Sequence, residues 1–193
     1  YLECYNAGRI EDVVIRQKHT WKERPKMGEL SQQEYIEAVE QSDTVSLSVE
    51  VMSEHDENLE STKVVVTLKD PNGVQLEQVV LPTIKEAVCA EIPVVKPMLW
   101  WCNGLGGQPL YKVQVSLLDD NQCVLDSKEY SIGLRELTVS TKKDEWGNEF
   151  AFVINGIHIF SMGADYIPED CIYPWITKER IEALIRSSAK ANY

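Results

Sequence analysis

The sequence predicts a mainly β protein whose larger part is an antiparallel β-sandwich. The first observation is a repeated alternation of apolar and polar residues over short segments, which turns one face of each segment toward a core. The second is a set of turn-forming residues that separate these segments. About seven or eight short strands joined by such turns are typical of two packed antiparallel sheets.

The alternation defines the expected strands. The alternating segments span residues 45–51, 64–68, 74–80, 88–94 and 111–117. Residues 12–17 and 123–137 are read as the first and the last strand. Asp70-Pro71-Asn72-Gly73 joins the third and fourth strands, because proline presets the second turn position and glycine accepts a positive φ. The alternating apolar residues are predicted to be buried between the two sheets. Cys89 lies within an apolar strand and is expected to be a small core residue.

Residues 20–42 interrupt the β pattern. Ser31 and Glu34 have the spacing of a capping box, in which each side chain satisfies a backbone N–H group of the other residue. Apolar residues follow at helical spacing at positions 35, 36, 38 and 39. The pattern predicts a helix from about 32 to 41. We interpret it as an insertion in the first connection between strands and as a decoration of the surface.

Composition excludes several classes of partner. The 193-residue chain has a net charge of −12, which disfavours nucleic acid because phosphates need a basic surface. No run of about 18 apolar residues is present, so no membrane span is predicted. The five cysteines fit neither a metal knuckle nor a dense disulfide framework, and they indicate free thiols in a reducing compartment. The expected localisation is therefore cytoplasmic. A lysosomal or secreted parent stays open, because the chain starts at Tyr1 without Met and looks like an excised piece.

The stretch from Pro97 to Tyr111 reads PMLWWCNGLGGQPLY. Adjacent residues of an extended chain point to opposite faces, so one of Trp100 and Trp101 is predicted to be buried. The stretch resembles the Trp-Trp-Pro-Asn-Gly-x-Gly-x-Gln-Pro-Leu-Tyr segment of glycoside hydrolase family 2, most closely its β-mannosidase branch, with Cys102 in place of the usual proline. In that family the segment lies in an immunoglobulin-like sandwich between a sugar-binding domain and a catalytic barrel. The resemblance therefore implies an immunoglobulin-like sandwich here.

The same resemblance predicts domain boundaries. Residues 1–8 are expected to be the tail of the preceding sugar-binding domain, and residues 9–137 the sandwich, which closes with Gly133-Leu134-Arg135. Residues 138–193 are expected to be an N-terminal, incomplete piece of a catalytic (β/α)8 barrel.

Two patterns support that last assignment. Residues 150–160 predict a β-hairpin with a turn at Asn155-Gly156, similar to the family's lead-in to its barrel. Residues 163–170 resemble the Gly-Ala-Asn-Trp-Ile-Pro-x-Asp segment at the first barrel strand, which would span 159–163 here. Thr177 is a predicted cap of the helix that completes this single β-α unit. The apolar stripe of that helix needs burial, either on the sandwich or in a homodimer formed through the barrel segment.

No catalytic residue, metal site or cofactor is predicted. A (β/α)8 barrel needs at least ~200 residues, and the two catalytic glutamates of the family lie on later barrel strands than this chain contains. Glu54 to Glu57 combine carboxylates with His55, but they lack repeated ligand spacing and read as a charged turn. Asp165 and Tyr166 would emerge at the barrel mouth, where the family commonly has Asn and Trp. They are the candidate substrate-binding residues of the parent enzyme, and a supporting role in the scaffold is the alternative.

Three functions compete at this stage, and the third, a purely structural spacer, overlaps with the first. The first is a non-catalytic central fragment of a retaining exo-glycosidase, whose parent would hydrolyse terminal β-D-mannosides in a β-linked oligosaccharide. The second is a self-standing sandwich that binds carbohydrate or protein, because exposed aromatic rings can stack on sugars. The aromatic candidates for such a face are Trp100, Trp101, Tyr111, Trp146 and Trp175.

Overall fold

The computed structural model describes residues 4–5, 7–26, 28–56, 61–83, 87–163 and 165–191. Residues 1–3 and 6 of the predicted tail at residues 1–8 lie outside these residues. The chain divides into two compact units. The first comprises Tyr1–Val139 and Val153–Ile157, and the second comprises Ser140–Phe152 and His158–Tyr193. The assignment of the boundaries 9–137 and 138–193 to family domains stays a prediction.

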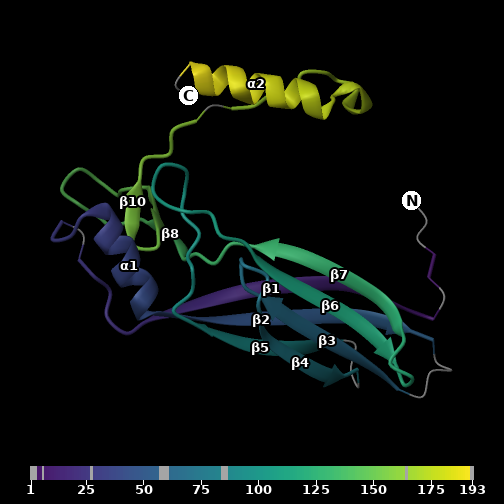
Figure 1. The fold of residues 1–193 in the computed structure, drawn as a ribbon. Coiled ribbons are helices and arrows are strands. Elements are labelled where there is room, and N and C mark those ends of the chain that lie inside the picture. Colours follow the sequence, from purple (N-terminus) through teal and green to yellow (C-terminus); the bar gives the residue numbers. More distant parts are fainter. Residues whose placement is uncertain are drawn as a thin grey trace. The chain divides into compact units, whose positions relative to one another are not determined.

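The first unit is built on two antiparallel sheets, which confirms the predicted sandwich (Figure 1). One sheet has the order β1-β2-β5, and its strands are β1 (Gly8–Trp21), β2 (Asp43–His55) and β5 (Ala87–Val95). The other has the order β4-β3-β6-β7, and its strands are β3 (Thr62–Lys69), β4 (Gln75–Pro82), β6 (Tyr111–Asp119) and β7 (Val124–Ile132).

The core follows the period-two pattern of the sequence. Every second residue of β2 from Val45 to Val51 is fully buried, and the same holds for β3 from Val64 to Leu68. The matching residues of β5 and β6 complete the inner faces; they are Ala90, Ile92, Val94, Val113, Val115 and Leu117. Burial of these branched side chains is the main favourable term for the sandwich.

Two predictions about the core are wrong. In β4 the apolar residues Leu76 and Val80 are 45% and 54% exposed, because Val79 and Leu81 are the residues that pair with Val66 and Val64. Cys89 is also exposed. Since its neighbour Ala90 faces inward, the alternation itself places Cys89 on the outer face.

Helix α1 (Gln32–Ser42) lies at one end of the two sheets (Figure 1). Its N-terminus has the predicted capping box between Ser31 and Glu34, which lowers the pKa of Glu34 through the hydrogen bonds from Ser31. The helix is more than a surface decoration, because Tyr35 and Val39 are 2% and 0% exposed. It therefore forms part of the core at this end.

The strand expected to run from 123 to 137 is interrupted. β7 ends at Ile132, and residues 133–136 have no regular structure. Leu137 begins β8 (Leu137–Ser140), which belongs to a third sheet of order β10-β9-β8. The predicted hairpin forms its other strands, β9 (Ala151–Ile154) and β10 (Ile157–Ile159).

In the second unit a short 3-10 helix, η1 (Tyr173–Trp175), precedes helix α2 (Lys178–Lys190). The side chain of Thr177 caps α2 by accepting a hydrogen bond from the backbone of Arg180, as predicted. Arg180 also forms an ion pair with Glu169 at 2.9 Å. None of the residues of α2 is buried, so the predicted burial of its apolar stripe and the predicted homodimer stay predictions.

Candidate functional site

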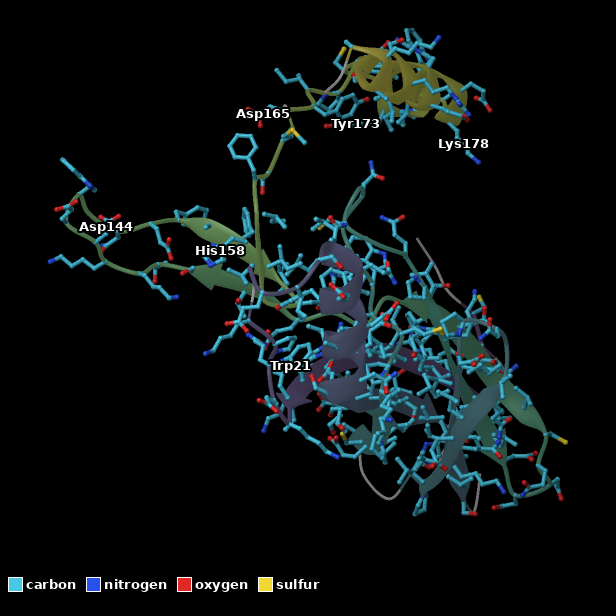
Figure 2. All side chains as sticks on the ribbon, turned by 60° about the vertical axis from the view of Figure 1, so that its left-hand side comes forward. Trp21, Asp144, His158, Asp165, Tyr173 and Lys178 are labelled. Carbon is cyan, nitrogen blue, oxygen red and sulfur yellow. The ribbon has the colours of Figure 1, made fainter. Side chains whose placement is uncertain are left out.

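Asp165 and Tyr166 lie on an irregular segment between β10 and η1. Asp165 is labelled in Figure 2. Both are exposed, and within the described residues neither has a hydrogen bond or ion pair. The expected barrel strand at 159–163 is wrong for this structure, since Ile159 ends β10 and residues 160–163 are irregular. A barrel strand is held by hydrogen bonds to a neighbour on each side, and no described strand pairs with this segment. Ala164 lies outside the described residues.

The structure brings a different set of predicted residues together, around the Trp-Trp stretch. Trp101 is 1% exposed and Trp100 is half-buried, which confirms the prediction that one of the two rings is buried. Trp101 donates its backbone N–H group to Gly107 at 2.9 Å. A Cβ atom at Gly106 would lie 2.9 Å from the Trp101 ring, so the glycine-rich loop is what allows the chain to close over the indole.

Helix α1 holds the start of this stretch. The carboxylate of Glu40 accepts a hydrogen bond from the backbone N–H group of Leu99 at 3.0 Å. Burial raises the pKa of Glu40, and the bond from Leu99 opposes that rise. The Trp101 indole also favours the charged form of Glu40, although its Nε1 atom has no acceptor with hydrogen-bond geometry.

Tyr111, the first residue of β6, holds the same stretch at another point. Its hydroxyl accepts a hydrogen bond from the backbone N–H group of Met98 at 2.9 Å. Tyr111 is 2% exposed, and this burial raises the pKa of its phenol. The hydroxyl is therefore neutral near pH 7.

A second arrangement lies where residues 133–136 leave the sandwich. We call Trp100, Gln17, Glu136, Asn155 and Tyr35 the junction cluster. The amide of Gln17 donates to the carbonyl of Gly133 at 3.3 Å and accepts from the N–H group of Arg135 at 2.9 Å. The guanidinium of Arg135 in turn lies 4.8 Å from the centre of the Trp100 ring.

The end of β1 adds charged and aromatic groups beside this cluster. Figure 2 shows Trp21 at the end of that strand. Arg24 stacks over the Trp21 ring at 4.7 Å and forms an ion pair with Glu136. The carboxylate of Glu136 also accepts a bond from the Trp21 indole at 3.4 Å. These groups pair with one another and hold chain segments together.

The side chains of His19 and Asp43 form a buried hydrogen bond near the same end. Nδ1 of His19 lies 2.6 Å from Oδ2 of Asp43, and the two side chains are 3% and 0% exposed. Nε2 of His19 faces Oε1 of Gln17 at 3.3 Å. Because that oxygen already accepts from Arg135, both ring nitrogens of His19 face acceptors.

Most aromatic residues proposed for a sugar-binding face are not free to stack on a ligand. Trp101 and Tyr111 are buried. The Trp100 ring lies against the backbone of Gly133 and beneath Arg135. Trp146 and Trp175 are 87% and 62% exposed, and both belong to the second unit.

The described residues contain no group of three or more His, Cys, Asp or Glu side chains that could hold a metal ion. In the region around His55, Glu54 pairs with Arg9 at 2.9 Å, and Glu57 lies outside the described residues. Across the same described part of the chain, no helix has the length and apolar character to cross a membrane. All five cysteines are free thiols.

Sequence reasoning did not identify Gln17, His19, Asp43 and Asn155 as members of hydrogen-bonded polar networks. A signal for two of them was available. Gln17 and His19 continue the phase of Ile15 on β1, opposite the buried residues Leu47 and Val45. A polar residue in the inward phase of a strand predicts a polar network at the end of a core. For Asp43 and Asn155 the partners are far away in the sequence, and no local pattern marks them.

Comparison with known proteins now places the chain. The sequence model of glycosyl hydrolases family 2 matches residues 32–135, just over half of the chain. The chain belongs to this family. The match begins at the first residue of α1, so it does not support the view that this helix is an insertion.

Within the family the chain is β-mannosidase-like. It is 38% identical over 99 residues to β-mannosidase B of Aspergillus flavus, which covers 51% of this chain and 12% of the relative. It is 40% identical over 97 residues to β-mannosidase B of Emericella nidulans, which covers 50% of this chain and 11% of the relative. The chain thus spans only about an eighth of the length of the curated relatives that it matches.

Solved structures agree with this placement. The β-D-mannosidase of Dictyoglomus thermophilum matches with a TM-score of 0.70 and 26% identity, over 95% of this chain and 20% of that one. A β-glucuronidase of Bifidobacterium dentium matches with a TM-score of 0.52 and 19% identity, over 78% of this chain and 20% of that one. The second likeness shows a shared fold only.

Proposed function

We propose that this chain is the central sandwich of a retaining exo-glycosidase, together with the first part of its catalytic barrel. In this proposal the fragment is not catalytic, and the parent hydrolyses terminal β-D-mannosides. The observation that carries the proposal is the likeness to a β-D-mannosidase structure, because it extends over 95% of the chain. The β-mannosidase B relatives support the choice of substrate.

The interactions around the Trp-Trp stretch suit a supporting role. The carboxylate of Glu40 accepts from a backbone N–H group, and that of Glu136 accepts from an indole and pairs with an arginine of the same unit. Retaining hydrolysis needs two carboxylates ~5–5.5 Å apart across a sugar, one acting as acid and one as nucleophile. Carboxylates committed to such partners serve to fix the loops of the sandwich.

The first test is an activity assay. The purified 193-residue chain is expected to release no 4-nitrophenol from 4-nitrophenyl β-D-mannoside above a buffer control. The longer protein encoded around it is expected to hydrolyse this substrate and to prefer it to the β-D-galactoside and the β-D-glucuronide. Turnover by the fragment, retained after further purification, would overturn the non-catalytic assignment. Preference for another glycoside would overturn the substrate assignment.

Within the same proposal Asp165 and Tyr166 contact the substrate of the parent. Their exposure in an irregular segment leaves both side chains accessible. The matched test is Asp165→Asn in the longer protein, which keeps the shape and removes the charge. A direct contact predicts a several-fold fall in kcat/KM, equivalent to a loss of ~1 kcal/mol or more of transition-state stabilisation. Unchanged kinetics with a changed melting temperature would instead make Asp165 part of the scaffold.

The alternative, a self-standing binding sandwich, keeps only the exposed Trp146 and Trp175 as aromatic candidates. It predicts that the chain binds an immobilised mannan and that Trp146→Ala weakens this binding. Absence of binding, measured by affinity electrophoresis, favours the fragment proposal.

A further inference from the structure

The Asn155-Gly156 turn is buried, although such a turn normally faces solvent. Asn155 and Gly156 have φ values of 47° and 87°, as the tight turn of a two-residue hairpin requires. That requirement is local and leaves the asparagine side chain free. Here Asn155 is 0% exposed, so the turn has a role beyond reversing the chain.

All four hydrogen-bonding groups of Asn155 are used. Its backbone N–H donates to the carbonyl of Glu136 at 2.9 Å, and its Oδ1 accepts from the N–H group of Glu136 at 2.9 Å. Its Nδ2 donates to the carbonyl of Trp100 at 3.1 Å. Its own carbonyl accepts from the Tyr35 hydroxyl at 3.2 Å. One residue thus joins helix α1, the Trp-Trp stretch and the segment that closes the sandwich.

These partners require asparagine and fix its orientation. Glu136 presents a donor and Trp100 presents an acceptor, so the side chain must offer one oxygen and one N–H group. Aspartate has the same shape but cannot donate to Trp100, and it would place a charge in a buried position. Replacement of Asn155 by Asp therefore changes the hydrogen-bond pattern and keeps the shape of the side chain.

Gly156 closes the arrangement on the other side. A Cβ atom at this position would lie 2.6 Å from the Tyr35 hydroxyl. The backbone of the turn therefore packs directly against helix α1. The turn residues 153–157 belong to the first unit, while the chain continues from both strands of the hairpin into the second.

We infer that Asn155 is a positioning residue that latches the β9–β10 hairpin to the end of the sandwich. The inference rests on the proposed function, in which this hairpin leads the chain into the catalytic barrel. The latch fixes the point from which the barrel starts, by means of buried bonds to three segments of the sandwich. Asn155 acts through the hairpin and does not itself touch substrate.

The test compares Asn155→Gly and Asn155→Asp in the 193-residue chain. Glycine accepts the positive φ, so Asn155→Gly removes the side-chain bonds without backbone strain. Asn72→Gly is the matched control, because Asn72 also precedes a glycine in a turn and is exposed. Hydrogen exchange of the backbone amides is followed in β9 and β10, and in β3 and β6 as a reference for the core.

Both Asn155 variants are expected to lower protection in the hairpin by roughly tenfold, the factor for one to two net hydrogen bonds, with β3 and β6 unchanged. Tyr35→Phe is expected to give a smaller loss in the same strands, and Asn72→Gly none. Unchanged hairpin protection would overturn the latch, and so would an equal loss in β3 and β6, which would mark a general stability effect.

A separate measurement distinguishes the latch from the proposed function. In the longer protein, Asn155→Asp is expected to lower kcat for 4-nitrophenyl β-D-mannoside with little change in KM. Loss of hairpin protection together with an inactive longer wild-type protein would overturn the proposed function and leave the latch standing. Full activity of Asn155→Asp would overturn the positioning role.

Discussion

Replacement of Trp101 by alanine tests whether the Trp-Trp stretch organises the sandwich. The side chain is 1% exposed, and a tryptophan buries about 150–250 Å². At about 25 cal/mol per Å² this corresponds to roughly 4–6 kcal/mol, an upper value because an unfolded chain already buries part of its surface. Measured losses for buried Trp or Phe to Ala are about 3–5 kcal/mol. We therefore expect Trp101→Ala to lower the free energy of unfolding by about 4 kcal/mol.

Two matched variants sharpen this prediction. Trp100 is only half-buried and interacts with Arg135, so Trp100→Ala should cost about half as much, including about 0.5–1 kcal/mol for the lost cation–π contact. Trp101→Phe keeps an aromatic ring and removes the unpartnered Nε1–H group. Its cost should stay below about 1.5 kcal/mol, because relief of the unsatisfied donor offsets part of the lost volume.

Urea unfolding followed by far-UV circular dichroism measures all three variants without using tryptophan as the probe. The midpoint is expected to fall most for Trp101→Ala, with the slope unchanged. The reasoning is refuted if Trp100→Ala costs as much as Trp101→Ala. It is also refuted if Trp101→Phe is as destabilising as the alanine variant.

Three further predictions concern charged and exposed groups. His19→Ala removes the hydrogen bond between the His19 ring and the buried carboxylate of Asp43 and should cost about 1–3 kcal/mol in urea unfolding, whereas Arg16→Ala, which breaks an exposed ion pair, should cost no more than about 1 kcal/mol. Burial raises the pKa of Glu40 in the folded state. The contribution of Glu40 to folding stability is therefore fully present below its unfolded-state pKa of about 4.3, and it is lost as the pH rises through its folded-state pKa. Glu40→Gln should therefore gain stability relative to wild type between pH 4 and 7, and equal differences at both pH values would contradict this. Cys89 should react with a maleimide in the folded chain at a rate near that of a free thiol. Reaction only after unfolding would show that Cys89 is buried.

Much of the fold could be predicted from the sequence. Alternation of apolar and polar residues located the strands from Val45 to Leu117, because a strand with one buried face imposes a period of two. The capping box at Ser31 and the turn at Asn155-Gly156 were also predictable, since both depend on residues close together in the chain. The long motif at 97–111 indicated the family.

A period of two does not say which face is inside. In β4 the outward Leu76 and Val80 looked like core residues, and the pairing of Val79 with Val66 decided otherwise. For Trp100 and Trp101 the sequence required opposite faces, and the loop closed by Gly106 selected Trp101 for burial. Register and loop closure are long-range properties, so each was settled only when the strands came together.

The sequence by itself determined the family, the strands between Val45 and Leu117 and the turns that join strands, because those depend on neighbouring residues. The tertiary structure decided which polar residues work together. Asp43 meets His19 across 24 positions, and Asn155 reaches Trp100 across 55 and Tyr35 across 120. Hydrogen bonds between buried polar groups need partners at fixed distances and angles. Only the folded chain brings groups so far apart in sequence to those positions.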